Sequence, residues 1–395
     1  MPHLKKKSKN SKKKDFKKLK KKIKTLNVVP IEPRAIESDW WDSFCHKISS
    51  SPGLTIPNDK EEAFKYFFRV SKTTFEYICS LVRDDLISRP PSGLINIEGR
   101  LLSVEKQVAI AMRRLASGDS QVSVGASFGV GQSTVSQVTW RFIESLEVRA
   151  KHHIKWPDQD KLEQIKSKFQ SVFGLPNCCG SVDATHILMT LPSVQTSDDW
   201  CDEARNYSML LQGIVDDEMR FLDVVTGWPG AMTVSRFLKC SGFYKLCENG
   251  ERLSKKLRLG ENIEIREYIV GGVYYSLLPW LITPYEDQDF ATINSKFREA
   301  HDAARLLGVR ALSHLKGSWR ILSKVMWRPD KSKLPSIILA CCLLHNIMID
   351  SGDKLLSNVA IPEHHDFGYE EKSCKFVDTL GSTMRDNLVK CLQPR

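Results

Sequence analysis

The sequence predicts an α/β protein in which a mixed sheet is flanked by helices, after an all-helical region and a lysine-rich tail. Two alternating runs, Met209–Val215 and Arg220–Thr226, are joined by the polar turn Asp216–Met219, which is typical of a β-hairpin. Helical segments and a further strand follow this hairpin, as in α/β folds. In the first half of the chain, apolar residues recur at three-to-four spacing, which indicates helices.

The bulk composition supports a folded core and excludes several classes of protein. The chain has 395 residues, of which 42% are hydrophobic. No apolar run approaches the roughly 18 residues of a membrane span, and no apolar run follows the N-terminal lysines as in a secretory signal. The eleven cysteines form no CxxC pair. We therefore expect reduced thiols in a cytosolic or nuclear protein, without a structural zinc site.

The positive charge of the chain is concentrated in its first 24 residues. They hold thirteen lysines and one aspartate, and the remaining chain has 45 basic and 46 acidic residues. We interpret residues 1–38 as a disordered basic tail and linker, since self-repulsion and low hydrophobicity oppose folding. The tail could serve nuclear import, contact DNA weakly, or only solubilise the chain. The import candidates are Lys5, Lys6, Lys7, Lys12, Lys13, Lys14, Lys17, Lys18, Lys20, Lys21 and Lys22.

Residues 39–155 are interpreted as a helical region. Order is expected to begin near Asp39, where Trp40 and Trp41 would serve as core or docking aromatics. Residues 61–87 carry a broad apolar face at helical spacing, and the run Pro90–Gly93 then breaks the chain.

Residues 104–148 fit a helix-turn-helix. A helix over Val104–Ser117 precedes two shorter segments, Gln121–Phe128 and Gln132 to about Val148. Gly125 stands where the two helices would cross closely, and Gly129 stands where the turn needs a positive φ.

Short polar side chains would be exposed at the start of the second of these helices. Residues of this type can read base edges in the major groove. The face is only weakly basic, so a helical hairpin that merely packs is the alternative. The DNA-binding candidates are Gln132, Ser133, Thr134, Ser136, Gln137 and Arg141.

Residues 156–350 are interpreted as the sheet domain, and residues 351–395 as a C-terminal extension. Strands are expected over Cys178–Asp183, His186–Thr190, Met209–Val215, Arg220–Thr226 and Tyr268–Gly271. Helices are expected over 161–173, from 234 or 235 to 244, over 297–322 and over 335–349.

Asp183 is the acidic residue that the sheet would hold near its centre. A carboxylate in an apolar strand is costly to bury unless a partner pairs with it, and a divalent metal is the usual partner in phosphoryl-transfer sites. Asp183 could instead be a hydrogen-bonded structural acid with a pKa raised by burial. His186 and His345 are interpreted as core histidines with satisfied hydrogen bonds.

Several motifs, in one order between residues 39 and 350, resemble the plant domesticated Harbinger-type (PIF/Harbinger) transposase-derived proteins. They are Trp40–Phe44, Gln132–Gln137, Gly174–Gly180, Met219–Val224, Gly227–Gly230, Leu277–Leu281, Thr283–Tyr285 and Cys341–Asn346. The resemblance implies an RNase H-like DDE nuclease fold in which acidic residues from four places bind two divalent metal ions, Mg²⁺ or Mn²⁺.

Three of the four acidic positions of the family are changed here. Asp183 matches the first position, whereas Val234, Gly272 and Val309 stand at the other three. Neither valine nor glycine offers the hard oxygen ligands that Mg²⁺ requires. We therefore expect a nuclease fold without catalytic residues, with Asp183 as the remnant of a metal site that no longer binds its ions tightly and no cofactor.

The resemblance also implies a nuclear protein that associates with Polycomb repressive complex 2 and antagonises silencing, and a Myb-like DNA-binding partner protein. One alternative is an endonuclease with an altered site built from Asp216, Asp217, Asp223, Glu299 and Asp302. The other is a sequence-specific DNA-binding factor acting through Gln132–Arg141.

Overall fold

The computed structural model describes residues 39–49, 57, 59–88, 102–192, 197–259, 263–285, 295–353 and 372–392. The eleven lysines proposed for nuclear import lie outside these residues. The chain divides into two compact units, Met1–Ser43 and Phe44–Arg395, and the second contains both the sheet and most of the helical region. The finer domain boundaries given above stay predictions.

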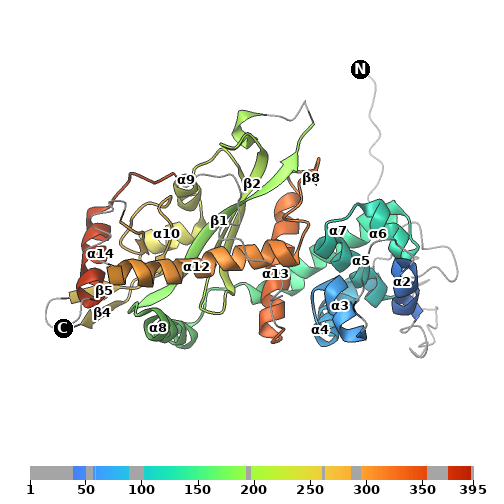
Figure 1. Ribbon diagram of the computed structural model, residues 1–395, viewed down its shortest axis with the longest axis horizontal. Coiled ribbons are helices and arrows are strands. Elements are labelled where there is room, and N and C mark those ends of the chain that lie inside the picture. The colour runs from blue at the N-terminus through green and yellow to red at the C-terminus, as the bar shows by residue number, and fades with distance from the viewer. Residues whose placement is uncertain are drawn as a thin grey trace, which may run out of the picture. The chain divides into compact units, whose positions relative to one another are not determined.

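The main sheet is built around one long strand, β1. The order β3-β2-β1-β6-β7 runs across it, and β8 pairs with the far end of β1 (Figure 1). β1, β2 and β3 are antiparallel, whereas β6 and β7 continue in parallel to β1. The strands are β1 (Cys178–Thr190), β2 (Tyr207–Val215), β3 (Phe221–Pro229), β6 (Tyr268–Val270), β7 (Leu281–Ile282) and β8 (Met326–Trp327). The predicted α/β class with a mixed sheet is thereby confirmed.

Helices cover this sheet, and the long helix α12 crosses it in front of β1 (Figure 1). α8 also packs against β1, and α13 packs against β3. The helices of this part are α8 (Gln159–Phe173), α9 (Val234–Lys239), α10 (Gly242–Glu248), α12 (Ser295–Ser318), α13 (Leu334–Asp350) and α14 (Thr379–Leu392). None of the helices in the described residues is long and apolar enough to cross a membrane.

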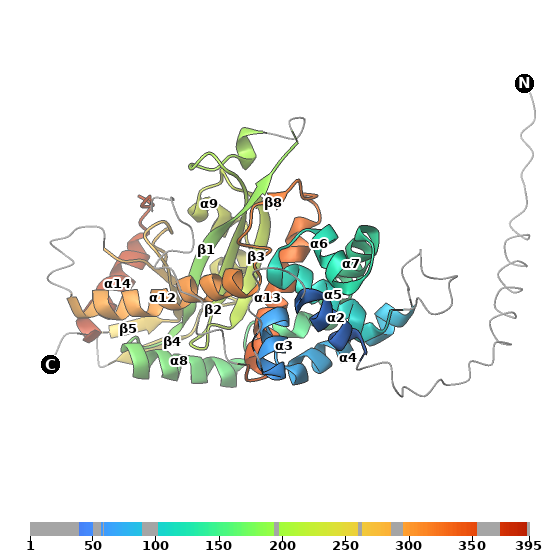
Figure 2. The same cartoon turned by 45° about the vertical axis from the view of Figure 1, so that its right-hand side comes forward.

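The helical region packs around an aromatic core, and Figure 2 shows its helices gathered beside α13. Phe44 contacts Phe67 and Phe128, with ring centroids 5.1 and 4.7 Å apart. α7 also packs against α13 and so connects the helical region to the sheet part. The helices are α2 (Asp39–Ser49), α3 (Lys60–Phe68), α4 (Lys72–Ser88), α5 (Val104–Ser117), α6 (Gln121–Phe128) and α7 (Gln132–Arg149), followed by the short η2 (Lys151–His153).

Three expected elements differ from those observed. The single helix expected over 61–87 is two helices, because Arg69 takes a left-handed conformation with a φ of 68° after α3. The two strands expected over 178–190 are one, since Ala184 and Thr185 pair with β2 without interruption. The helix expected to end at residue 244 is divided at Cys240, where α9 closes and Ser241 caps α10.

Several elements were not expected from the sequence, among them the short strands β7 and β8. A small hairpin of β4 (Lys256–Leu259) and β5 (Ile263–Arg266) follows α10. α14 lies in the C-terminal extension and packs against β5, α12 and β7. The extension thus contributes to the core of the sheet part, where Leu388 is fully buried.

The segment α6–α7 has the bounds that the sequence predicts. Gly129 ends α6 with a φ of 68°, as the predicted turn requires. A Cβ atom on Gly125 would lie 2.6 Å from the carbonyl oxygen of Val130, so the chain approaches α6 closely there. Whether this two-helix segment reads DNA stays a prediction.

Candidate functional site

Asp183 lies fully buried in the middle of β1, opposite Gly213 of β2. The parallel pairing of β1 with β6 ends two residues earlier, at Ser181. Past that point, the side of β1 away from β2 faces the loop that follows β6 (Gly271–Tyr275), which carries the predicted third acidic position. The sequence therefore places the remaining acid of the family at the centre of the sheet, as expected.

Tyr274 interacts directly with this acid, because its hydroxyl donates a hydrogen bond to Asp183 Oδ1. A Cβ atom on Gly272 would lie only 2.6 Å from the ring of Tyr274. The aromatic ring thus fills the space beside residue 272, where the family's acidic side chain would begin. A phenol that donates a hydrogen bond to the carboxylate thus takes a position beside Asp183 where a metal site would need a further carboxylate.

Helix α12 approaches β1 too closely for another side chain to point at Asp183. A Cβ atom on Gly308 would lie 3.0 Å from both Asp183 Cβ and Ser181 Oγ. Ser181 also donates a hydrogen bond of 3.1 Å to the carbonyl oxygen of Arg305. Gly308 therefore faces Asp183. The next residue in the chain is Val309, which is buried and stands at the predicted fourth position. An alignment shift of one residue would still place no carboxylate there.

Val234 is the first residue of α9 and packs against an apolar cluster that includes Val182 and Trp280. Its neighbour Ser235 is hydrogen-bonded to Ser276, which follows Tyr274 and Tyr275 in the chain. The second predicted position is thus occupied by a valine that contributes to packing. Three of the four places around the ancestral site hold aliphatic residues or glycine.

The residues present do not fit a divalent metal ion. No group of three or more His, Cys, Asp or Glu side chains within the described parts of the chain could hold one. Asp183 alone supplies one carboxylate, and Tyr274 donates to it. The two-metal site that the resemblance implies needs acidic residues from four places, and the described residues supply one of them.

The other acids do not form a replacement site. Asp223 lies 3.6 Å from Arg252, and Asp302 lies 3.7 Å from Arg298 on the same helix. Glu299 is exposed on α12. The altered site considered above from these residues is thus not assembled in this structure.

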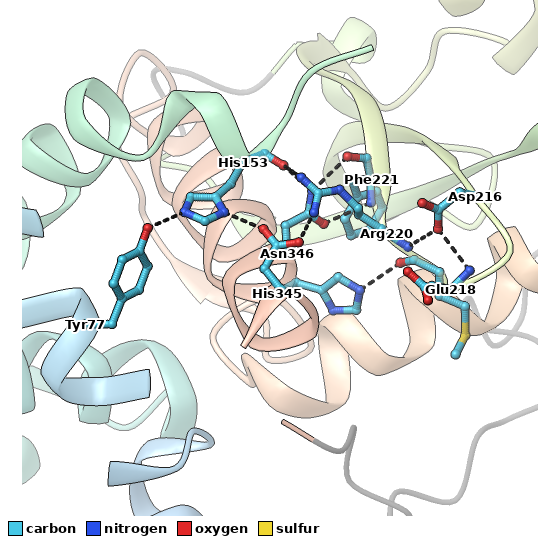
Figure 3. A network of polar contacts seen from close by, with 10 residues as sticks. Tyr77, His153, Asp216, Glu218, Arg220, Phe221, His345 and Asn346 are labelled. Carbon is cyan, nitrogen blue, oxygen red and sulfur yellow. Dashed lines mark hydrogen bonds and ion pairs between the residues drawn. The ribbon is translucent and has the colours of Figure 1, made fainter. Parts of the chain in front are cut away.

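Asp216 is a structural acid in the β2–β3 turn. Its Oδ1 atom accepts hydrogen bonds from the backbone N–H groups of Glu218 and Arg220, at 3.0 and 2.9 Å (Figure 3). Burial raises the pKa of Asp216 to about 6. The carboxyl group therefore fixes the conformation of the turn.

His186 and His345, the two histidines interpreted as core residues, each have a hydrogen-bond partner inside the fold. His186 Nδ1 lies 2.9 Å from Ser208 Oγ, which donates to Asp202 at 2.8 Å. His345 Nε2 donates to the carbonyl oxygen of Met219 at 3.0 Å (Figure 3), and burial lowers the pKa of His345 to about 4. His345 is thus a neutral core residue.

The motif that contains His345 connects the helical region to the sheet. Asn346 accepts from the N–H of Phe221 and donates to the carbonyl oxygens of Phe221 and His153, at 2.7–2.9 Å (Figure 3). Arg220 donates to the His153 carbonyl oxygen as well, and Tyr77 of α4 lies 3.0 Å from His153 Nε2. Side chains from α4, η2 and α13, Arg220 before β3 and the backbone of Phe221 in β3 therefore meet in one polar network.

Four of the six predicted DNA-binding side chains lie on one exposed stretch of α7. Gln132, Ser133, Ser136 and Gln137 are exposed, and Thr134 is half-buried. Arg141 differs, because its guanidinium donates to the carbonyl oxygen of Leu86 at 2.9 Å and to Gln107 at 3.3 Å. This arginine is turned into the helical region and stabilises the packing of α4, α5 and α7.

Two residues of the site escaped sequence reasoning. Tyr274 and Gly308 decide the geometry around Asp183, yet no ligand-like spacing marks either of them. The signal was indirect: each lies within two residues of a position where the family's acid is missing, Gly272 and Val309 respectively.

A family model and several known proteins match this chain, and their descriptions agree with one another. The model of the DDE superfamily endonuclease family matches residues 182–346. The chain is 63% identical to the protein Antagonist of Like Heterochromatin Protein 1 of Arabidopsis thaliana, over 98% of both chains. It is 49% identical to an Arabidopsis thaliana ALP1-like protein, over 89% of this chain and 84% of the relative.

A more distant relative lies outside plants. The putative nuclease HARBI1 of Rattus norvegicus is 25% identical, over 77% of this chain and 82% of the relative. No solved structure matches. The order of the motifs, the mixed sheet around Asp183 and these similarities lead to one conclusion: the chain belongs to the Harbinger-type transposase-derived family, whose members carry a DDE superfamily endonuclease domain.

Proposed function

We propose that this protein is a nuclear chromatin regulator that keeps the nuclease fold, does not cut DNA and acts through protein partners. The observation that carries this proposal is the Tyr274 hydroxyl hydrogen-bonded to Asp183, in the space beside Gly272. The valines at positions 234 and 309 support it as well, since they remove oxygen ligands from two further places around the site.

The proposed partners follow from the relatives. One relative is named an antagonist of like heterochromatin protein 1, which indicates a role in chromatin for that protein. By resemblance, we propose association of this chain with Polycomb repressive complex 2, where it would counteract silencing, and with a Myb-like DNA-binding protein. The eleven candidate lysines of the tail would direct nuclear import.

A cleavage assay tests the loss of activity. Purified full-length protein would be incubated with plasmid and with linear duplex DNA in Mg²⁺ or Mn²⁺, beside an Asp183→Asn variant. We expect no metal-dependent cutting by either protein. Cutting by the wild type that chelation stops and Asp183→Asn abolishes would overturn the proposal and favour the endonuclease.

Affinity purification from nuclei tests the regulatory role. We expect the wild type and Asp183→Asn to recover the same subunits of Polycomb repressive complex 2 at equal yield, because Asp183 is buried. Loss of these subunits with Asp183→Asn, in protein that melts at the wild-type temperature, would contradict the proposal. If neither preparation contained the complex, the proposed association with Polycomb repressive complex 2 would be wrong.

The nuclear location has its own test. Changing the tail lysines to glutamine should abolish nuclear accumulation of a fluorescent fusion, whereas changing them to arginine should preserve it, since arginine keeps the charge. Equal nuclear accumulation of both fusions would show that the tail is not the import signal.

A second candidate function is sequence-specific DNA binding by α7. The exposure of Gln132, Ser133, Ser136 and Gln137 favours it. Selection of binding sites by the full-length protein should then enrich one sequence, and Gln132→Ala with Gln137→Ala should remove that preference. A steep salt dependence without sequence preference would argue against this function.

A further inference from the structure

Beside the end of β1, the chain presents its most exposed tryptophan among the described residues. Trp327 of β8 is 77% exposed, and Val325, two residues earlier, is 55% exposed. Large apolar side chains at this level of exposure are costly to leave in water, and tryptophan is the residue most enriched at binding hot spots. Neither side chain contributes to the hydrophobic core.

The backbone that presents Trp327 is fixed. Met326 and Trp327 pair with Met189 and Thr190 of β1. The N–H of Arg328 donates to both the carbonyl oxygen and the hydroxyl of Thr190, at 3.1 and 3.0 Å. Arg328 also holds a φ of 44°, in the left-handed region that non-glycine residues rarely adopt. An exposed aromatic on a fixed backbone loses little conformational entropy on binding.

Three cations follow Trp327 in the chain, and each lies over an indole ring, although only Arg328 lies over Trp327 itself. The guanidinium of Arg328 lies 5.1 Å from the ring centre of Trp327. Lys331 lies 4.8 Å from Trp200, and Lys333 lies 4.6 Å from Trp140 of α7. The one acid of the segment, Asp330, accepts hydrogen bonds from the N–H and hydroxyl of Ser332, so it serves the local turn. The segment 325–333 therefore combines two exposed apolar side chains with three cations.

We propose that the Trp327 surface, formed by Val325, Trp327, Arg328, Lys331 and Lys333, binds an acidic segment of a partner protein that also carries aliphatic or aromatic side chains. Acidic groups would pair with the three cations, and apolar side chains would cover Trp327 and Val325.

A protein partner fits better than single-stranded nucleic acid. Bases stack on open aromatic faces, whereas here each indole already has a cation over one face. The inference rests on the part of the proposed function that invokes protein partners, and it does not depend on the loss of cleavage.

Peptide selection tests this surface. A display library of twelve-residue peptides would be selected on full-length protein and counter-selected on Trp327→Ala. We expect the enriched peptides to combine acidic with apolar residues. Trp327→Ala and the double variant Lys331→Glu/Lys333→Glu should each weaken binding of these peptides about tenfold or more, as for a hot-spot residue.

Matched variants on α8 serve as controls. Val172→Ala changes another exposed apolar residue, and Lys161→Glu/Lys168→Glu reverses the same number of charges. Both should bind the selected peptides like the wild type. Because the test residues lie at the surface, all variants should melt at the wild-type temperature.

Three results would overturn the inference. The first is a library from which no peptide distinguishes the wild type from Trp327→Ala. The second is enrichment of peptides without acidic residues. The third is unchanged peptide binding with loss of binding to a single-stranded or duplex oligonucleotide, which would assign the surface to nucleic acid. Each of these results leaves the recovery of chromatin subunits as a separate test of the proposed function.

Discussion

At the scale of single residues, the pair Gly272 and Tyr274 determines the chemistry that remains at the centre of the sheet. The glycine leaves room for the ring, and the ring brings a hydroxyl to Asp183. Each change depends on the other, since a side chain at 272 would displace the ring and break its hydrogen bond.

This dependence predicts a non-additive mutant cycle. Gly272→Ala should lower the free energy of unfolding by about 1–3 kcal/mol, because the new methyl group forces the ring of Tyr274 away from Asp183. In a Tyr274→Ala background, the same substitution should cost less than about 0.5 kcal/mol. Urea denaturation of the four proteins measures both values. Equal costs in the two backgrounds would show that the ring does not occupy this space.

Asp216 predicts a pH dependence of stability. Burial raises its pKa from 3.8 to about 6, so folding disfavours the ionised carboxylate. The stability contributed by this group is therefore present at low pH and is lost as the pH rises from about 4 to 6. Asp216→Asn keeps the Oδ1 acceptor but cannot ionise. Relative to the wild type, this variant should gain about 2–3 kcal/mol between pH 4 and pH 8.

Asp330 provides the control for this experiment. Hydrogen bonds from Ser332 lower the pKa of Asp330, so its carboxylate is favoured in the folded chain and its contribution to stability is lost only as the pH falls below about 4. Relative to the wild type, Asp330→Asn should therefore change little in stability between pH 4 and pH 8. Parallel pH profiles for the wild type and Asp216→Asn would contradict the expected effect of burial.

At the scale of elements, sequence reasoning succeeded where local signals agree with the fold. The bounds of α5, α6 and α7 follow from apolar spacing and from glycines at their ends. It failed where the outcome depends on distant contacts. The left-handed turn after α3 falls on Arg69 rather than on a glycine, so the sequence does not indicate it. The position of α14 depends on its packing against β5, α12 and β7 rather than on its own sequence pattern.

The same distinction applies to the site. The missing carboxylates at 234, 272 and 309 could be predicted from flanking motifs. The position of Tyr274 and the close approach of Gly308 could not, because both depend on how a loop and a helix meet β1 in three dimensions.

The α6–α7 segment carries a prediction of its own. Gly125→Ala should lower the free energy of unfolding by about 1–3 kcal/mol, since its methyl group would lie 2.6 Å from the backbone oxygen of Val130. The matched change Gly242→Ala, on a helix where nothing lies within 4 Å, should be neutral or slightly stabilising. Chemical denaturation compares the two, and equal effects would mean that the segment is loosely packed.

At the scale of the whole molecule, the network around Asn346 makes the helical region and the sheet depend on one another. Asn346 of α13 forms three hydrogen bonds, two with the backbone of Phe221 in β3 and one with the carbonyl oxygen of His153 in η2. His153 lies in turn 2.5 Å from Asp350 at the end of α13. Asn346 is fully buried at the centre of this network, and a buried polar group stabilises the fold only when it is paired.

Asn346→Asp tests this connection. The new carboxylate would face the carbonyl oxygens of Phe221 and His153 in the core and should cost about 3–5 kcal/mol at neutral pH. Because both parts share the network, fluorescence and circular dichroism should report one transition at a lower urea concentration. Asn249→Asp, an exposed control, should leave the midpoint unchanged. Two separate transitions in Asn346→Asp would show that the parts unfold independently.

The Tyr274 hydroxyl on Asp183 has an evolutionary consequence. A lineage that regained one acid at a time would first have to expel the phenol, and it would bear a weakened fold before any ion could be held. Under the proposed function, each intermediate on the way back to a nuclease would have to fold, so the proposed loss of cleavage would be hard to reverse. Reversal would need several codons to change together.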